Sequence, residues 1–66
     1  MKYYINGLEV SAHYFFNLLE QDVYDAWIKG LLLNDETFQY NYYKVKYKLN
    51  KGETFCHNNV YCKELI

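Results

Sequence analysis

The chain has 66 residues, enough for one small hydrophobic core and too few for a second, so we expect a single domain over residues 1–66. The net charge is −1 at pH 7, which argues against simple electrostatic adhesion to nucleic acid or to an anionic membrane. Nine tyrosines and four phenylalanines are more rings than one helix on one sheet face buries, so several must be exposed. No apolar run reaches the ~18 residues of a membrane-spanning helix and no signal-peptide region precedes the first predicted strand, so we expect a soluble, intracellular protein.

The N-terminal half predicts a hairpin followed by a helix. Asn6-Gly7 accepts the positive φ angles of a type I′ turn, so residues 2–10 predict a short β-hairpin. Ser11 then stands at the N-cap position, where its hydroxyl accepts a hydrogen bond from the first helical turn. We predict one long helix over residues 11–30, with Trp27 buried against the sheet. The end of the helix is marked by Gly30 or by Asn34-Asp35, and the three leucines at 31–33 fit either a last helical turn or a buried connection. The core-facing stripe of this helix comprises Ala12, Phe15, Phe16, Leu19, Val23, Ala26, Trp27 and Gly30.

Residues 37–49 show an alternation of side chains that predicts a β-strand. One face would carry Tyr43, Val45, Tyr47 and Leu49, and the other face Lys44, Lys46 and Lys48. In a regular strand, Phe38, Tyr40 and Tyr42 join the lysines, and the outer face is aromatic and basic. A bulge near Tyr42-Tyr43 would instead turn both sets of rings inward and leave only the lysines outside. The two registers remain open, because the pattern alone does not distinguish them.

The remaining residues predict two more strands. Asn50-Lys51-Gly52 is typical of a turn, so residues 53–57 should run back beside the preceding strand. Asn58-Asn59 then turns the chain again into residues 60–65. The predicted fold is therefore α+β: a small antiparallel β-sheet, made of the N-terminal hairpin and a C-terminal three-stranded meander, packed on one long α-helix.

Cys56, His57 and Cys62 are close enough in the sequence to raise the question of a metal site. Structural zinc takes four ligands, and adjacent strand residues such as Cys56 and His57 point to opposite faces, so we expect no metal and no cofactor. A two-residue Asn58-Asn59 turn would place the two cysteines on opposite faces of the hairpin. We therefore expect free thiols rather than an obligatory disulfide.

The titratable residues form no recognisable catalytic pattern. Neither histidine has a serine, carboxylate or cysteine at a spacing that defines a catalytic site, so the sequence predicts that the protein is not an enzyme. We interpret Asp22 and Asp25 as part of a solvated helix face. On that face Asp25 should pair with Lys29, four residues later.

Two predicted surfaces remain for partner binding. The outer face of the sheet combines rings and lysines, which suits single-stranded nucleic acid. The side of the helix opposite the core exposes rings and aliphatic side chains among polar residues, as protein interfaces do. The candidate residues are Tyr40, Tyr42, Lys44, Lys46 and Lys48 on the sheet, and Tyr24 and Ile28 on the helix. We favour a non-enzymatic protein-binding module; a nucleic-acid-binding module and a structural homodimer are the alternatives.

The chain is short, rich in tyrosine, asparagine and lysine, and opens with Tyr-Tyr-Ile-Asn-Gly and a Ser-capped helix. In these respects it resembles the small accessory proteins carried by phages and mobile elements of low-GC Gram-positive bacteria, a group that includes anti-CRISPR proteins. The resemblance implies a stoichiometric inhibitor that occludes a larger host protein, such as a CRISPR effector, in the cytoplasm of a bacterial host. Many such inhibitors are strongly acidic mimics of DNA, and this chain is not.

Overall fold

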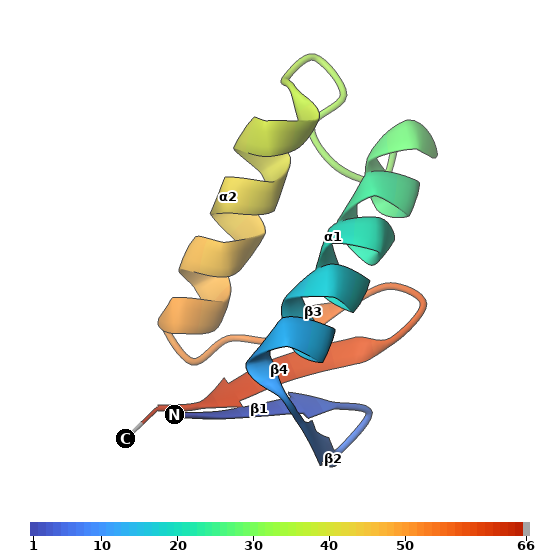
Figure 1. The fold of residues 1–66 in the computed structure, drawn as a ribbon. Helices are drawn as coiled ribbons and strands as arrows, with labels where there is room; N and C mark the ends of the chain where they lie inside the picture. Colours follow the sequence, from blue (N-terminus) through green and yellow to red (C-terminus); the bar gives the residue numbers. More distant parts are fainter. Residues whose placement is uncertain (66) are drawn as a thin grey trace.

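The structure of the protein, a computed structural model, describes residues 1–65. Two helices stand on one face of a four-stranded antiparallel sheet, and α1 runs away from the sheet while α2 returns to it (Figure 1). The elements in chain order are β1 (Lys2–Ile5), β2 (Leu8–Val10), α1 (Ala12–Ile28), α2 (Phe38–Asn50), β3 (Phe55–Cys56) and β4 (Val60–Glu64). The predicted α+β fold is confirmed, but the helices are two rather than one.

The sheet joins the two ends of the described chain. Its strand order is β2-β1-β4-β3, and all neighbouring strands are antiparallel. In the centre, Tyr4 of β1 lies opposite Cys62 of β4. The predicted three-stranded C-terminal meander is therefore wrong, because the C-terminal part is a two-stranded hairpin whose β4 pairs with β1.

The first hairpin and the start of α1 form as the sequence predicts. Asn6 and Gly7 have φ angles of 53° and 82°, the positive values that a type I′ turn requires. The Ser11 hydroxyl oxygen accepts a hydrogen bond from the Tyr14 amide at 3.2 Å, so the N-cap is confirmed. Gly30 has a φ of 74° and lies just after the helix, where the left-handed conformation is characteristic of a C-terminal cap.

The predicted stripe on α1 is right at its centre and wrong at its ends. Phe15, Leu19 and Val23 are fully buried, whereas Ala12 is exposed. Trp27 is only half-buried and lies beyond the sheet, where its indole donates a hydrogen bond to the Glu36 carbonyl at 3.0 Å. The expectation that Trp27 is buried against the sheet is therefore wrong. Trp27 belongs instead to a group of rings between the two helices.

Residues 37–49, which the sequence predicts as a strand, lie almost entirely within α2. The predicted strand is therefore wrong in both of its registers. The Thr37 hydroxyl caps α2 by accepting a hydrogen bond from the Tyr40 amide at 3.1 Å. The buried side chains Asn41, Val45 and Leu49 recur every four residues. Val45 and Leu49 belong to the core, and Asn41 bonds the segment that connects the helices. At the other end, Gly52 has a φ of 87° and caps the helix instead of forming a hairpin turn.

The core lies where both helices meet the sheet. It is built from side chains of β1, α1, α2 and β4, which are Ile5, Phe15, Leu19, Val23, Val45, Leu49 and Tyr61. Tyr61 is fully buried, and its hydroxyl donates to the Leu18 carbonyl at 3.3 Å. This burial raises the pKa of Tyr61.

The turn between β3 and β4 has a different length from the predicted one. Cys56 pairs with Val60, so three residues rather than two form the turn. Both cysteines therefore lie on the same face of the sheet, with Cys62 two residues further along β4, and both are free thiols. Within residues 1–65, neither helix is long and apolar enough to cross a membrane.

Candidate functional site

The side of α2 that faces away from the core carries three exposed tyrosines. Tyr40, Tyr43 and Tyr47 follow the spacing of one helix face, and 43%, 73% and 57% of their surfaces are exposed. We call them the tyrosine row. Exposed rings on a single helix face resemble the anchors of protein interfaces, where tyrosine provides a large contact area with little loss of conformational entropy.

Two lysines lie beside the tyrosine row, one helical turn apart. The ammonium nitrogen of Lys44 lies 5.6 Å from the centre of the Tyr40 ring, within the range of a cation–π contact. Lys48 follows four residues later and is exposed. Among the residues that the structure describes, no carboxylate lies within 4.0 Å of either lysine. Both positive charges are therefore available to an external partner.

A groove of about 420 Å³ adjoins these lysines. One wall is the segment that connects the helices, with Leu31, Leu32 and Leu33, and the other is α2. Leu31 and Leu33 are 62% and 47% exposed, so the wall presents aliphatic surface to solvent. Lys44 and Lys48 line the same groove, which we call the leucine groove.

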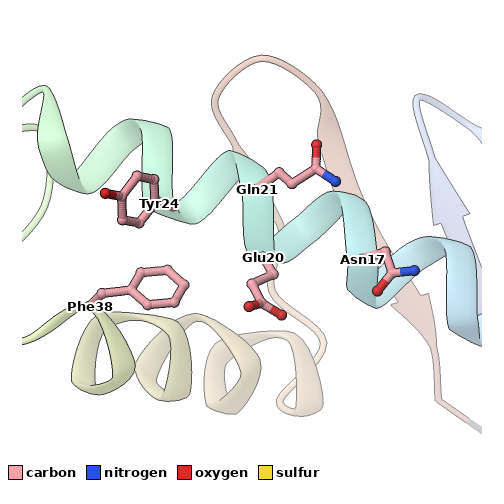
Figure 2. A pocket seen from close by; sticks show the side chains of 5 residues that line it. All are labelled: Asn17, Glu20, Gln21, Tyr24 and Phe38. Atoms are coloured by element: carbon pink, nitrogen blue, oxygen red, sulfur yellow. The ribbon is translucent and has the colours of Figure 1, made fainter.

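A second groove, of about 340 Å³, lies between the helices on another side of the molecule. Figure 2 shows Tyr24 of α1 facing Phe38 of α2, with polar side chains further along α1. The two ring centres are 5.4 Å apart. The polar side chains that line the groove are Asn17, Glu20 and Gln21. Tyr24 is thus partly covered by a ring of its own chain.

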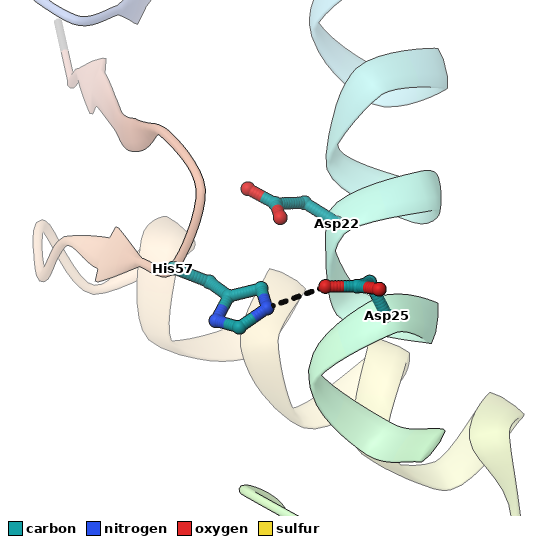
Figure 3. Close-up of side chains that lie close together, drawn as sticks. All are labelled: Asp22, Asp25 and His57. Carbon is teal, nitrogen blue, oxygen red and sulfur yellow. Dashed lines mark hydrogen bonds and ion pairs between the residues drawn. The ribbon is translucent and has the colours of Figure 1, made fainter. Parts of the chain in front are cut away.

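A cluster of titratable groups, Asp22, Asp25 and His57, joins α1 to the β3–β4 turn (Figure 3). We call it the polar cluster. The buried carboxylate of Asp22 accepts hydrogen bonds from the backbone amides of Asn58 at 3.2 Å and Asn59 at 3.1 Å. Asp22 therefore holds the turn against the helix, and its interpretation as a solvated residue is wrong.

Asp25 completes the polar cluster at its solvent side. One of its oxygens accepts from the His57 ring at 2.8 Å and from Lys29 at 3.0 Å, which confirms the predicted pair of Asp25 and Lys29. The hydrogen bond from His57, which has the larger effect, and the bond from Lys29 lower the pKa of Asp25 from 3.8 to about 2.

The same three residues have the donor types of a metal site. One ligand atom of each lies within 4.8 Å of the others. However, the two oxygens of Asp22 already accept two backbone amides, and the His57 ring already bonds Asp25. These hydrogen bonds already account for the arrangement of the three side chains, so the geometry fits a structural role in holding the turn.

The structure separates the candidate residues that the predicted strand would have placed on one face. Tyr40, Lys44 and Lys48 lie on the outer side of α2 or at its groove. Tyr42 instead faces α1, and its hydroxyl donates to the Phe16 carbonyl at 3.4 Å. Lys46 lies over the Phe16 and Tyr42 rings, 5.5 Å and 5.2 Å from their centres.

The candidates on α1 are exposed, as the sequence analysis expected. Tyr24 and Ile28 have 49% and 58% of their surfaces exposed. They lie on the half of α1 that extends beyond the sheet (Figure 1). Their role in partner binding stays a prediction.

Sequence reasoning missed Tyr43 and Tyr47, because a strand would have turned both toward the core. The helical spacing of Asn41, Val45 and Leu49 was the signal that could have placed them outside. The polar cluster had no such signal, because Asp22 and the backbone amides that donate hydrogen bonds to it are more than 30 residues apart in the sequence.

Comparison of the chain with protein-family models, with curated proteins and with solved structures finds no significant match.

Proposed function

We propose that this protein is a non-enzymatic binding module that docks on an acidic surface of a host protein through the outer side of α2. The observation that carries the proposal is the tyrosine row beside Lys44 and Lys48, which have no carboxylate partner within residues 1–65. Aromatic anchors give an interface most of its free energy, and complementary charge gives it orientation and a fast association rate. The resemblance to phage-encoded accessory proteins supports an inhibitor of a host protein, such as a CRISPR effector, as the form of this activity.

The polar cluster supports binding rather than catalysis. Its carboxylates and imidazole are the groups of the described chain that come closest to a catalytic arrangement, yet they bond to one another and to backbone amides. A general base must reach a proton of the substrate, whereas these groups hold the β3–β4 turn on α1. Their contacts maintain the shape of the domain.

The lysines support a protein partner over nucleic acid. On a strand, Lys44, Lys46 and Lys48 would have formed one basic row, but on α2 the ammonium group of Lys46 lies over the rings of Phe16 and Tyr42. Two neighbouring unpaired lysines release few counterions, so they provide little affinity for a phosphate backbone. Nucleic-acid binding and homodimer formation are therefore outcomes that the following test must exclude.

The test compares a double tyrosine variant of α2 with a single tyrosine variant of α1 as its control. Tyr43→Ala/Tyr47→Ala removes two rings of the tyrosine row, and Tyr14→Ala removes a ring that is 54% exposed on α1. Each protein is immobilised and exposed to a nuclease-treated lysate of a Gram-positive host, and a protein that it retains is then purified and titrated by calorimetry. We expect wild type and Tyr14→Ala to bind equally and the double variant to bind at least 30-fold more weakly, about 2 kcal/mol.

Three results would overturn the proposal. Equal binding by the double variant would exclude the tyrosine row as the docking surface. Material that is retained from an untreated portion of the lysate but not from the nuclease-treated one would favour nucleic acid. A wild-type dimer in sedimentation that becomes monomeric in the double variant would favour self-association.

A further inference from the structure

The leucine groove exposes aliphatic side chains to solvent. Leu32 packs against the core, whereas Leu31 and Leu33 on either side of it are largely exposed. Exposed apolar groups gathered in a concave site and bordered by polar groups are typical of binding sites. The groove therefore suits an apolar side chain that arrives from outside.

The wall of the groove is held in place by the buried side chain of Asn41. Its amide nitrogen donates to the Leu33 carbonyl at 2.9 Å, and its oxygen accepts from the Leu33 amide at 3.1 Å. The same nitrogen also donates to the Thr37 carbonyl at 2.9 Å. These bonds fix the backbone of the connecting segment to α2, so a ligand meets a groove that is already formed and loses less entropy on binding.

The chemistry of the groove selects the class of occupant. Lys44 and Lys48 line it without a carboxylate partner in the described chain, and their spacing places two positive charges along one side. The wall is aliphatic, made of leucines and Val45, whereas sites for unpaired bases provide aromatic rings for stacking. An acidic peptide with an apolar side chain matches both features.

We propose that the leucine groove binds an acidic segment of the partner protein, with one apolar side chain placed on Leu31 and Leu33 and flanking carboxylates paired with Lys44 and Lys48. The inference rests on the proposed protein-binding function and names the part of the partner that this site takes. The tyrosine row and the groove are then adjacent halves of one interface, since Lys44 touches both.

The probe for this inference is a displayed library of random 12-residue peptides selected on the wild-type protein. We expect the selected peptides to carry an apolar residue with aspartate or glutamate within four residues of it. A synthetic consensus peptide should lose at least tenfold in affinity for Lys44→Glu and for Lys48→Glu, and a similar factor for Leu33→Ser, which removes apolar surface without changing charge. Lys2→Glu, with the same charge change on β1, should bind as wild type does, and circular dichroism should show each variant folded.

Several outcomes would overturn the inference. Peptides without acidic residues, no enrichment, equal losses in Lys2→Glu and Lys48→Glu, or displacement by a single-stranded DNA oligonucleotide would each contradict an acidic-peptide site. The retained host protein separates this inference from the proposed function. If it binds Lys48→Glu and Leu33→Ser normally but not Tyr43→Ala/Tyr47→Ala, the groove inference fails, and docking of a host protein through the tyrosine row stands without the contribution of Lys48. If it binds the tyrosine double variant normally, the proposed function fails on its own test.

Discussion

Two regions of this small domain both carry polar and charged side chains and differ in how those side chains are partnered. In the polar cluster, the charged groups of Asp22 and Asp25 accept bonds from the β3–β4 turn and from a lysine of the same helix. On the outer side of α2, the lysines have no carboxylate partner within residues 1–65 and the tyrosine row is exposed. Partnered groups stabilise the fold, whereas unpartnered groups remain available for another molecule. This comparison predicts large stability losses in the first region and almost none in the second.

The largest loss should follow from Asp22→Ala. The change removes the buried carboxylate that accepts from two partly buried backbone amides of the turn, so the free energy of unfolding should fall by about 3 kcal/mol. Urea denaturation followed by circular dichroism measures this. Asp35→Ala, at an exposed position, is the control and should change little. If Asp22→Ala does not fold, Asp22→Asn retains one acceptor and should lose about half as much. A loss below 1 kcal/mol for Asp22→Ala would remove the contrast between the two regions.

Asn41→Ala should have the second-largest effect. Asn41 makes three hydrogen bonds to backbone groups of the segment before α2, and their loss should lower the free energy of unfolding by about 2 kcal/mol. Gln39→Ala on the exposed side of the same helix is the matched control and should be neutral or slightly stabilising. Equal values for the two variants would show that Asn41 does not hold the wall of the leucine groove.

Acidification should reduce stability by a smaller amount through Asp25. Its pKa is lowered from 3.8 to about 2 in the folded protein, so the folded state favours the charged form. That contribution is fully present above about pH 5 and is lost progressively as the pH falls through 3.8 and then through 2. Urea midpoints at pH 5 and pH 2.5 should differ more for wild type than for Asp25→Asn. The same pH dependence in both proteins would argue against a stabilising role of the charged carboxylate.

The smallest effect should be that of Tyr43→Ala/Tyr47→Ala on stability. Both rings are largely exposed, and alanine favours a helix more than tyrosine does, so the free energy of unfolding should change by no more than about 0.5 kcal/mol. The same variant is expected to lose partner binding, so it separates binding from folding. A loss above 1 kcal/mol would assign these rings to the stability of the domain.

The features that the sequence predicts correctly depend on neighbouring residues. The Asn6-Gly7 turn and the Ser11 cap each follow from the conformational preference of one or two residues. The same kind of local preference indicated Gly30 as one of two possible ends of the first helix, and its φ of 74° agrees with that choice. The prediction for residues 37–49 is wrong because the side-chain spacing of a strand and that of a helix overlap there. Lysines alternate with apolar residues as in a strand, while Val45 and Leu49 continue a helical spacing, and packing against α1 and the sheet determines the outcome.

The candidate site was only partly predictable for the same reason. Tyr40, Lys44 and Lys48 were named as binding residues, and they do lie near one another on α2. Lys46 and Tyr42 were grouped with them only because a strand was assumed, and the helix directs them toward Phe16. The leucine groove depends on contacts between the connecting segment and α2 that no local pattern specifies.

The pairing of β1 with β4 has a consequence for the synthesis of the protein. Lys2 lies opposite Glu64 and Ile5 opposite Tyr61, so the two central strands come from the first and the last residues that the structure describes. During synthesis on the ribosome, one edge of β1 therefore stays unpaired until residue 64 has emerged from the exit tunnel. Contacts between residues so far apart in the sequence form slowly, because the intervening chain must first be closed into a loop. The helices can form before this point, whereas the sheet and its core are completed only once residue 64 is free to pair with β1.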